Sequence, residues 1–219
     1  MLTLEAIMND PAIKVYIQRA DESLGALGFT EHSFCHVQHV AQTAGYILEV
    51  LGYDQRTVEV AKIAGYLHDI GNLVNRKEHS LSGAVMAWSI LNDMDCDPAE
   101  IATIVTAIGN HDEGTGVPVN AVAAAMQLAD KADVRWTRVR EKDPSKFDIH
   151  DRVNYSVKKS VLKINEEKTI VKLKLTVDTH YASVMDYFEI FMSRMILCRK
   201  AADKLGLQFK LIINEQQLI

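Results

Sequence analysis

Five imidazole and carboxylate side chains occupy positions where an amphipathic helix would place an apolar residue. His36 lies on the same helical face as the apolar positions of 40–51. His68 follows the apolar stripe of 60–67, and Asp69 comes directly after it. Because residues three or four apart share a helix face, this spacing predicts that the polar groups point toward the core.

Two later segments repeat this conflict between residue type and position. His111 extends the apolar stripe of 101–108, and Asp130 extends that of 122–126. A lone histidine on an apolar face is usually a hydrogen-bonded core residue, but a buried carboxylate without a partner is costly. Carboxylates and imidazoles converging from separate helices need a shared compensating charge, which divalent metal ions supply. The five positions together therefore predict a metal centre.

The elements that must position these groups change in type along the chain. Up to about residue 140 the apolar residues recur every three or four positions, which predicts about six helices. Alternation over 160–178 around a polar turn predicts a β-hairpin, followed by a helix over about 182–205 and a strand over 208–213. We expect a mainly α fold, with a helical domain over 1–143 and a small α+β (β-β-α-β) appendage over 144–219.

Composition limits the classes of function. The 219 residues are 48% hydrophobic and 24% charged, enough for one substantial core. The net charge of −5 argues against general nucleic-acid binding, although basic residues outnumber acidic ones after residue 144. The sequence has no run of about 18 apolar residues and no signal peptide, so a cytoplasmic protein without membrane contact is expected. Cys35, Cys96 and Cys198 form no CxxC pair and are interpreted as idle or buried thiols.

The order of these residues resembles a known family signature. His36, the pair His68-Asp69, and Asp130 are similar to the H…HD…D pattern of the HD-domain phosphohydrolases. The local sequences at 36–41, 64–71 and 128–133 agree with that family's three motifs, and the resemblance covers about residues 30–140. It implies the helical fold of that family, with metal-dependent hydrolysis of a phosphate ester or anhydride.

Two more histidines indicate the dinuclear type. His79, in the stretch His-Ser-Leu-Ser-Gly-Ala, resembles the H-x-x-x-G-A element of dinuclear members, and His111 resembles their next ligand. The sequence looks most like bacterial HD hydrolases that cleave diadenosine tetraphosphate, and less like HD-GYP cyclic-dinucleotide phosphodiesterases. From the latter it departs at Asn72, at 111–113 (His-Asp-Glu) and at 116–118 (Gly-Val-Pro).

The resemblance implies two sets of metal ligands that share Asp69. One ion would be held by His36, His68, Asp69 and Asp130, and the second by Asp69, His79 and His111. Imidazole and carboxylate without thiolate favour iron or manganese, with nickel, zinc and magnesium as further candidates. Such ions activate a water molecule that attacks phosphorus.

Cations near the motifs are candidates for contacting the substrate phosphate. Lys131 is the first choice, and Arg76 and Arg135 are further candidates. His32, one turn before His36, could touch substrate or an additional ion, but a surface histidine is the favoured interpretation.

Three functions remain open from the sequence. The favoured one is a hydrolase of a small phosphorylated substrate, expected to be a nucleotide, with the appendage serving homodimerisation or substrate shape. The alternatives are a metal-loaded nucleotide-binding regulatory module and an HD-type di-iron oxygenase, which the same ligands could serve.

Overall fold

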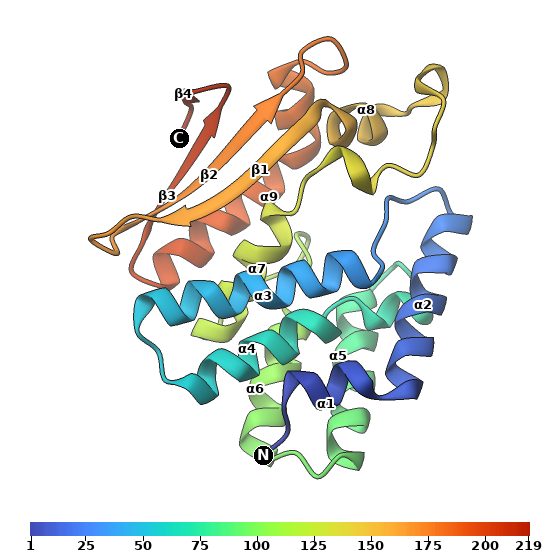
Figure 1. Cartoon of the computed structure of the whole chain (residues 1–219), viewed down its shortest axis with the longest axis vertical. Coiled ribbons are helices and arrows are strands. Elements are labelled where there is room, and N and C mark those ends of the chain that lie inside the picture. The colour runs from blue at the N-terminus through green and yellow to red at the C-terminus, as the bar shows by residue number, and fades with distance from the viewer.

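The computed structural model describes residues 1–219, and its first 140 residues are helical as predicted (Figure 1). The helices of this part are α1 (Leu4–Asn9), α2 (Pro11–Ala26), α3 (Phe34–Leu51), α4 (Gln55–Leu67), α5 (His79–Asp93), α6 (Pro98–Gly109) and α7 (Ala121–Ala132). Short 3₁₀ turns follow α4 and α7, namely η1 (Ile70–Leu73) and η2 (Trp136–Arg138). None of the helices has the length and hydropathy that a bilayer crossing demands.

Local capping sets where the ligand-bearing helices begin. Asp54 starts α4 and Asp97 starts α6, each accepting hydrogen bonds from two backbone amides of the first turn. The Asn120 side chain accepts from Ala123 N and starts α7. Because a helix start fixes the phase of every later residue, these caps determine which faces of α4, α6 and α7 turn inward.

Helices α3 and α4 pack together closely at a glycine. A Cβ built on Gly65 would lie 2.9 Å from the Ala41 Cα, which is backbone and cannot move aside easily. The missing side chain therefore permits the close approach of α3 to α4. Ala41 follows His36 by five residues and Gly65 precedes His68 by three, so the close approach brings the two histidine-bearing segments together.

The second part has the predicted β-β-α-β order, with a helix added before it and a short strand added after it. After η3 (Pro144–Lys146), helix α8 (Ile149–Ser156) precedes β1 (Val157–Ile164), β2 (Ile170–Val177), α9 (Val184–Lys204), β3 (Gln208–Ile213) and the short β4 (Gln216–Gln217). Strand β2 pairs antiparallel with β1 and parallel with β3, and β4 continues the sheet at its edge. Helix α8 was not predicted, because its eight residues carry too few apolar positions to show a period. Asp148 caps it by accepting from Asp151 N.

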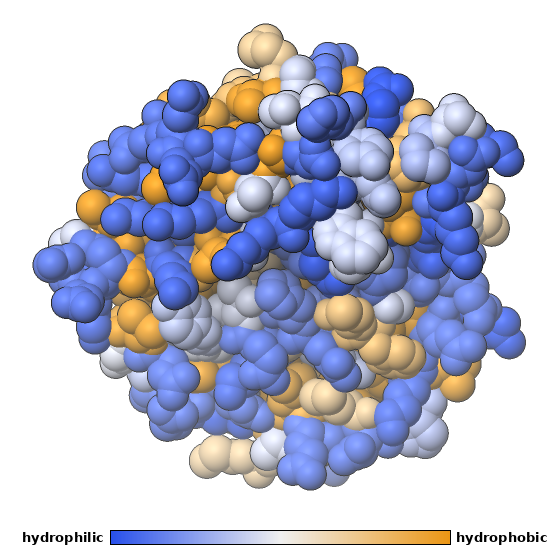
Figure 2. All heavy atoms as spheres, turned by 45° about the horizontal axis from the view of Figure 1, so that its top comes forward, coloured by the Kyte–Doolittle hydropathy of each residue, from blue (hydrophilic) through white to orange (hydrophobic).

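Helix α9 lies between the sheet and the helical part (Figure 1). Its buried residues pack against α7 on one side and β3 on the other, and a single apolar core runs through both parts of the chain. The opposite face of the sheet is open and carries unpaired lysines, with apolar residues between them (Figure 2). These lysines are Lys159, Lys163, Lys172, Lys174 and Lys210.

Candidate metal centre

Four of the predicted ligands converge at the ends of α3, α4 and α7. The His36 Nε2 lies 3.3 Å from the His68 Nε2 and 3.5 Å from both Asp69 Oδ2 and Asp130 Oδ1. The His68 Nε2 lies 3.2 Å from Asp69 Oδ2 and 3.7 Å from Asp130 Oδ1. Ligands at about 2.1 Å from one cation lie about 3.0 Å apart at right angles and about 3.4 Å apart in a tetrahedron. These four atoms therefore have the spacing of donors around a single ion.

The other oxygen of Asp69 faces a second pair of histidines. Asp69 Oδ1 lies 3.5 Å from His79 Nε2 and 3.7 Å from His111 Nε2, and these two nitrogens are 3.0 Å apart. Donor atoms of His68, Asp69 and His111 also lie within 4.8 Å of one another, so the two groups are contiguous. Asp69 thus presents one oxygen to each group, as a bridging carboxylate does.

Every histidine of the cluster is fixed in orientation through its outer nitrogen. The Nδ1 of His36 lies 2.7 Å from Asp133 Oδ2. The Nδ1 atoms of the other three rings lie 2.7 to 3.0 Å from backbone carbonyl oxygens, which belong to Gly65 (for His68), Arg76 (for His79) and Ile108 (for His111). Because a carbonyl only accepts, these Nδ1 atoms carry the proton and the Nε2 lone pairs face the centre. Lone pairs this close repel one another unless a proton or a cation lies between them, so the donor set fits a metal ion.

The buried charges of the centre stabilise one another. Burial opposes ionisation of Asp69 and Asp130, but His68 beside the first and Lys131 beside the second hold both pKa values well below the usual range. Burial lowers the pKa of His68, but the Asp69 and Asp130 carboxylates outweigh it and raise this pKa to about 10. Burial lowers the pKa of His79 to about 4 against the attraction of Asp69. The positive charges of His68 and Lys131 thus stabilise the ionised carboxylates of Asp69 and Asp130.

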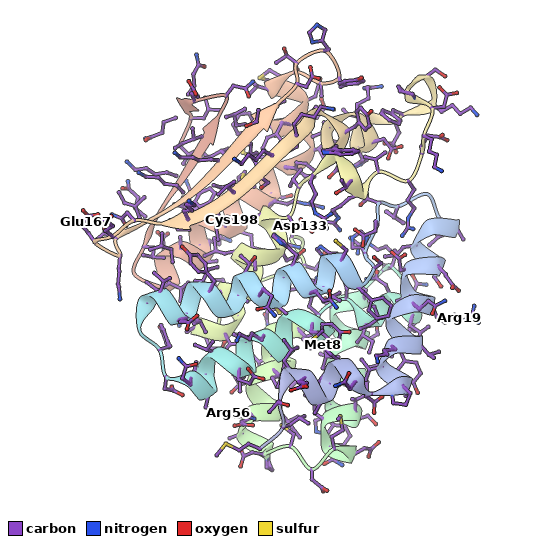
Figure 3. All side chains as sticks on the ribbon, in the orientation of Figure 1. Met8, Arg19, Arg56, Asp133, Glu167 and Cys198 are labelled. Carbon is purple, nitrogen blue, oxygen red and sulfur yellow. The ribbon has the colours of Figure 1, made fainter.

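Asp133 contacts the candidate ligand His36, a role that the sequence did not lead us to assign. Its Oδ2 lies 2.7 Å from His36 Nδ1, and its Oδ1 accepts from Arg135 Nε at 2.7 Å. Burial raises its pKa, but the His36 hydrogen bond and the charge of Arg138 lower it well below the usual value. Asp133 lies at the junction between the helical part and the appendage (Figure 3). Its spacing could have indicated this contact, because Asp133 follows the candidate ligand Asp130 by three residues.

Lys131 is buried and ion-paired. Its Nζ lies 2.6 Å from Asp130 Oδ2 and 3.3 Å from Glu113 Oε1. Glu113 Oε1 also lies 2.7 Å from Arg194 Nε in α9. Burial opposes the ionisation of Glu113, but Lys131 and Arg194 lower its pKa to about 2. Alternating charges thus link the ligand Asp130 to the appendage.

The remaining candidate residues lie around or away from the cluster. His32 is partly buried, and its ring centroid is 5.3 Å from that of His36, so it is not a free surface histidine. The Arg76 Nη1 lies 3.4 Å from His79 Nε2. Arg135 pairs with Asp133. Cys96 and Cys198 are buried free thiols, whereas Cys35 is an exposed one.

A helical fold that gathers histidines and aspartates into two adjoining groups defines a metal-binding protein of the HD type. The chain belongs to the HD domain family, whose model matches residues 33–189 and so extends into the appendage. It is 28% identical over 171 residues to an uncharacterized protein of Methanocaldococcus jannaschii, a match that covers 68% of this chain and 65% of that protein.

Two further similarities cover smaller parts. Ribonuclease Y of Lawsonia intracellularis is 33% identical over 105 residues, which is 47% of this chain and 18% of that protein. The chain therefore spans less than two thirds of the length of either relative. The crystal structure of a predicted HD superfamily hydrolase from an uncultured Thermotogales bacterium has a TM-score of 0.44 and 24% identity, and covers 62% of this chain and 75% of that one.

Proposed function

We propose that the protein is a metal-dependent phosphohydrolase that cleaves a nucleotide or a related small phosphoester or phosphoanhydride. The observation that carries this proposal is the division of Asp69, whose Oδ2 faces His36 and His68 while its Oδ1 faces His79 and His111. A carboxylate shared in this way suits two neighbouring divalent ions better than one. The membership of the HD domain family supports the same class of chemistry.

The proposed roles follow from the contacts. His36, His68, Asp69 and Asp130 would hold one divalent ion, and Asp69, His79 and His111 the other. Bound there, the ions would supply a hydroxide near neutral pH and neutralise phosphoryl oxygens. The carbonyls behind three of the rings fix the donor nitrogens in place before any ion arrives. Lys131 neutralises the outer oxygen of Asp130, and Arg76 adds positive charge beside His79.

The donor set also favours certain metals. Four imidazole nitrogens with two carboxylates and no thiolate suit iron or manganese, and also nickel or zinc, better than magnesium, which prefers oxygen ligands. Elemental analysis of the purified protein should show about two such ions per chain, if each group of donors holds one.

The proposal is tested by a hydrolysis screen of metal-loaded protein. The panel contains mononucleotides, dinucleoside polyphosphates, cyclic dinucleotides and, because one relative is named as a ribonuclease, a short RNA. We expect the wild type to release phosphate or a nucleotide from at least one class. Asp69→Ala should abolish turnover and reduce the metal content, whereas Asp93→Ala, an exposed aspartate in α5, should change neither. Full metal occupancy without turnover on any class, or an active Asp69→Ala, would contradict the proposal.

A further inference from the structure

A small cavity adjoins the metal centre at the boundary between the helical part and the appendage. Its volume is about 210 Å³, and both parts of the chain line it. Its lining includes Phe29, His32 and Arg76 from the helical part, and Asn154, Phe191 and Arg194 from α8 and α9.

Two of the residues that line the cavity also lie against candidate ligands. Arg76 Nη1 lies 3.4 Å from His79 Nε2, beside one group of donors. The His32 ring lies edge-on to His36, with their centroids 5.3 Å apart, beside the other group. A molecule in the cavity is therefore separated from each group of donors by one side chain, Arg76 or His32.

Two arginines bring positive charge to this cavity. Arg76 has no carboxylate within ion-pair distance, and Arg194 pairs only with Glu113, through its Nε. No hydrogen bond joins the terminal amino groups of Arg194 to another residue. Each guanidinium lies over an aromatic ring, with Arg76 Cζ 5.5 Å from the centroid of Phe29 and Arg194 Cζ 4.4 Å from that of Phe191. Stacked guanidinium groups keep their planar donors fixed, which suits the oxygens of a phosphate.

The wall formed by α8 has the opposite chemistry. Asp148, Asp151 and Asn154 line it with carboxylate and amide oxygens. Asp148 Oδ1 accepts from Asp151 N as the cap of α8, and neither aspartate forms an ion pair with the two arginines. Acceptors of this kind suit hydroxyl groups of a ligand. The cavity thus carries one guanidinium from the helical part, a second from α9, and the oxygen acceptors of α8.

We infer that this cavity is part of the substrate site, and that Arg194 of the appendage binds the phosphate of a small hydroxyl-bearing phosphomonoester. The inference rests on the proposed function. The volume of about 210 Å³ is below the range of about 300–1,000 Å³ typical of pockets for drug-sized ligands. An extended dinucleoside polyphosphate is therefore too large to be enclosed. The appendage completes the site, since Arg194 and Phe191 both come from α9.

The experiment compares Arg194→Met with Arg199→Met in the metal-loaded full chain. Arg199 lies on the same helix, is exposed and forms no ion pair, so it controls for the loss of a positive charge. Binding of inorganic phosphate is measured by calorimetry, and kcat and KM are measured with AMP. Because Arg194 would donate charged hydrogen bonds to the phosphate, Arg194→Met should raise the phosphate Kd and the KM about 10- to 100-fold. The loss should appear in both the phosphate Kd and the KM, whereas Arg199→Met should change neither.

A second variant separates ligand binding from a structural role. If Arg194 served only to hold Glu113, then Glu113→Gln would weaken phosphate binding as much as Arg194→Met does. We expect Glu113→Gln to lower the melting temperature while the phosphate Kd changes much less. Equal losses in both variants would overturn the inference.

The inference and the proposed function fail in different ways. Hydrolysis with a phosphate Kd that does not change in Arg194→Met overturns the inference and leaves the function standing. Arg194-dependent phosphate binding without hydrolysis of any substrate supports the site and contradicts the function. A lower KM for diadenosine tetraphosphate than for AMP overturns the size argument.

Discussion

Replacing Asp133 by Asn tests whether the orientation of one ligand matters to the centre. In the wild type, His36 Nδ1 lies 2.7 Å from Asp133 Oδ2. Asn keeps the shape of the side chain and an oxygen acceptor opposite this nitrogen, but it removes the negative charge. A neutral acceptor makes the ring a weaker donor to a metal. Loss of such a supporting partner typically lowers metal affinity about 10- to 100-fold, which is about 1.4 to 2.7 kcal/mol.

The loss of charge also affects two arginines. Arg135 Nε donates to Asp133 Oδ1, and Arg138, which is buried, lies 3.8 Å from Oδ2. Arg138 keeps its hydrogen bonds to the carbonyls of Asp133 and Glu31, so we expect the fold to survive with reduced stability.

The assay is a competition titration in which a chelator of known affinity withdraws metal from wild type, Asp133→Asn and Asp93→Asn. Circular dichroism in the same buffer shows that each protein is folded. We expect only Asp133→Asn to release metal at lower chelator concentration, by a factor of 10 to 100. A folded Asp133→Asn with wild-type affinity would refute the claim that this carboxylate tunes the His36 ligand.

Two further predictions concern protons and packing. The pKa of His68 without metal is raised to about 10, and the ring must lose its proton to bind an ion. The apparent metal affinity should therefore fall about tenfold for each unit of pH decrease below 10, for each proton displaced. A titration of metal affinity from pH 6 to 8 that shows no slope would disprove this linkage. In Gly65→Ala, the new Cβ would lie 2.9 Å from the Ala41 Cα, which should lower the free energy of unfolding by about 1–3 kcal/mol and weaken metal binding. In the control Gly25→Ala, the new Cβ meets only a flexible arginine at 3.4 Å, so the free energy of unfolding should stay near wild type. Denaturant unfolding of both variants measures the difference.

The sequence predicted those helices and strands whose buried residues recur at a regular spacing. The apolar stripes of the helices predicted that His36 and Asp130 point inward, and the alternation of apolar and polar residues predicted the β-hairpin. Both predictions were possible because the patterns repeat over many residues. Helix α8 escaped prediction because it has only eight residues and depends on the Asp148 cap. A short helix contributes too few positions for a period to appear.

Partners across the chain could not be predicted in the same way. The sequence contained Asp133, Glu113 and Arg194, but nothing local shows that Asp133 meets His36 or that Glu113 joins Lys131 to α9. Such contacts depend on how the helices pack, and the type of a single residue does not indicate that packing. For the same reason the sequence could not show that Lys131, the first candidate for contacting substrate, is buried and paired with Asp130.

These contacts relate the uneven distribution of charge along the sequence to the structure of the centre. Acidic residues dominate the helical part and basic residues the appendage. Where the two meet at the centre, Asp130, Lys131, Glu113 and Arg194 alternate in sign. A buried ligand carboxylate is stable only if charge of the opposite sign is supplied nearby, and Arg194 contributes to that balance from α9. The appendage is therefore coupled electrostatically to the centre, so its removal should disturb Asp130 even where no metal ligand is deleted.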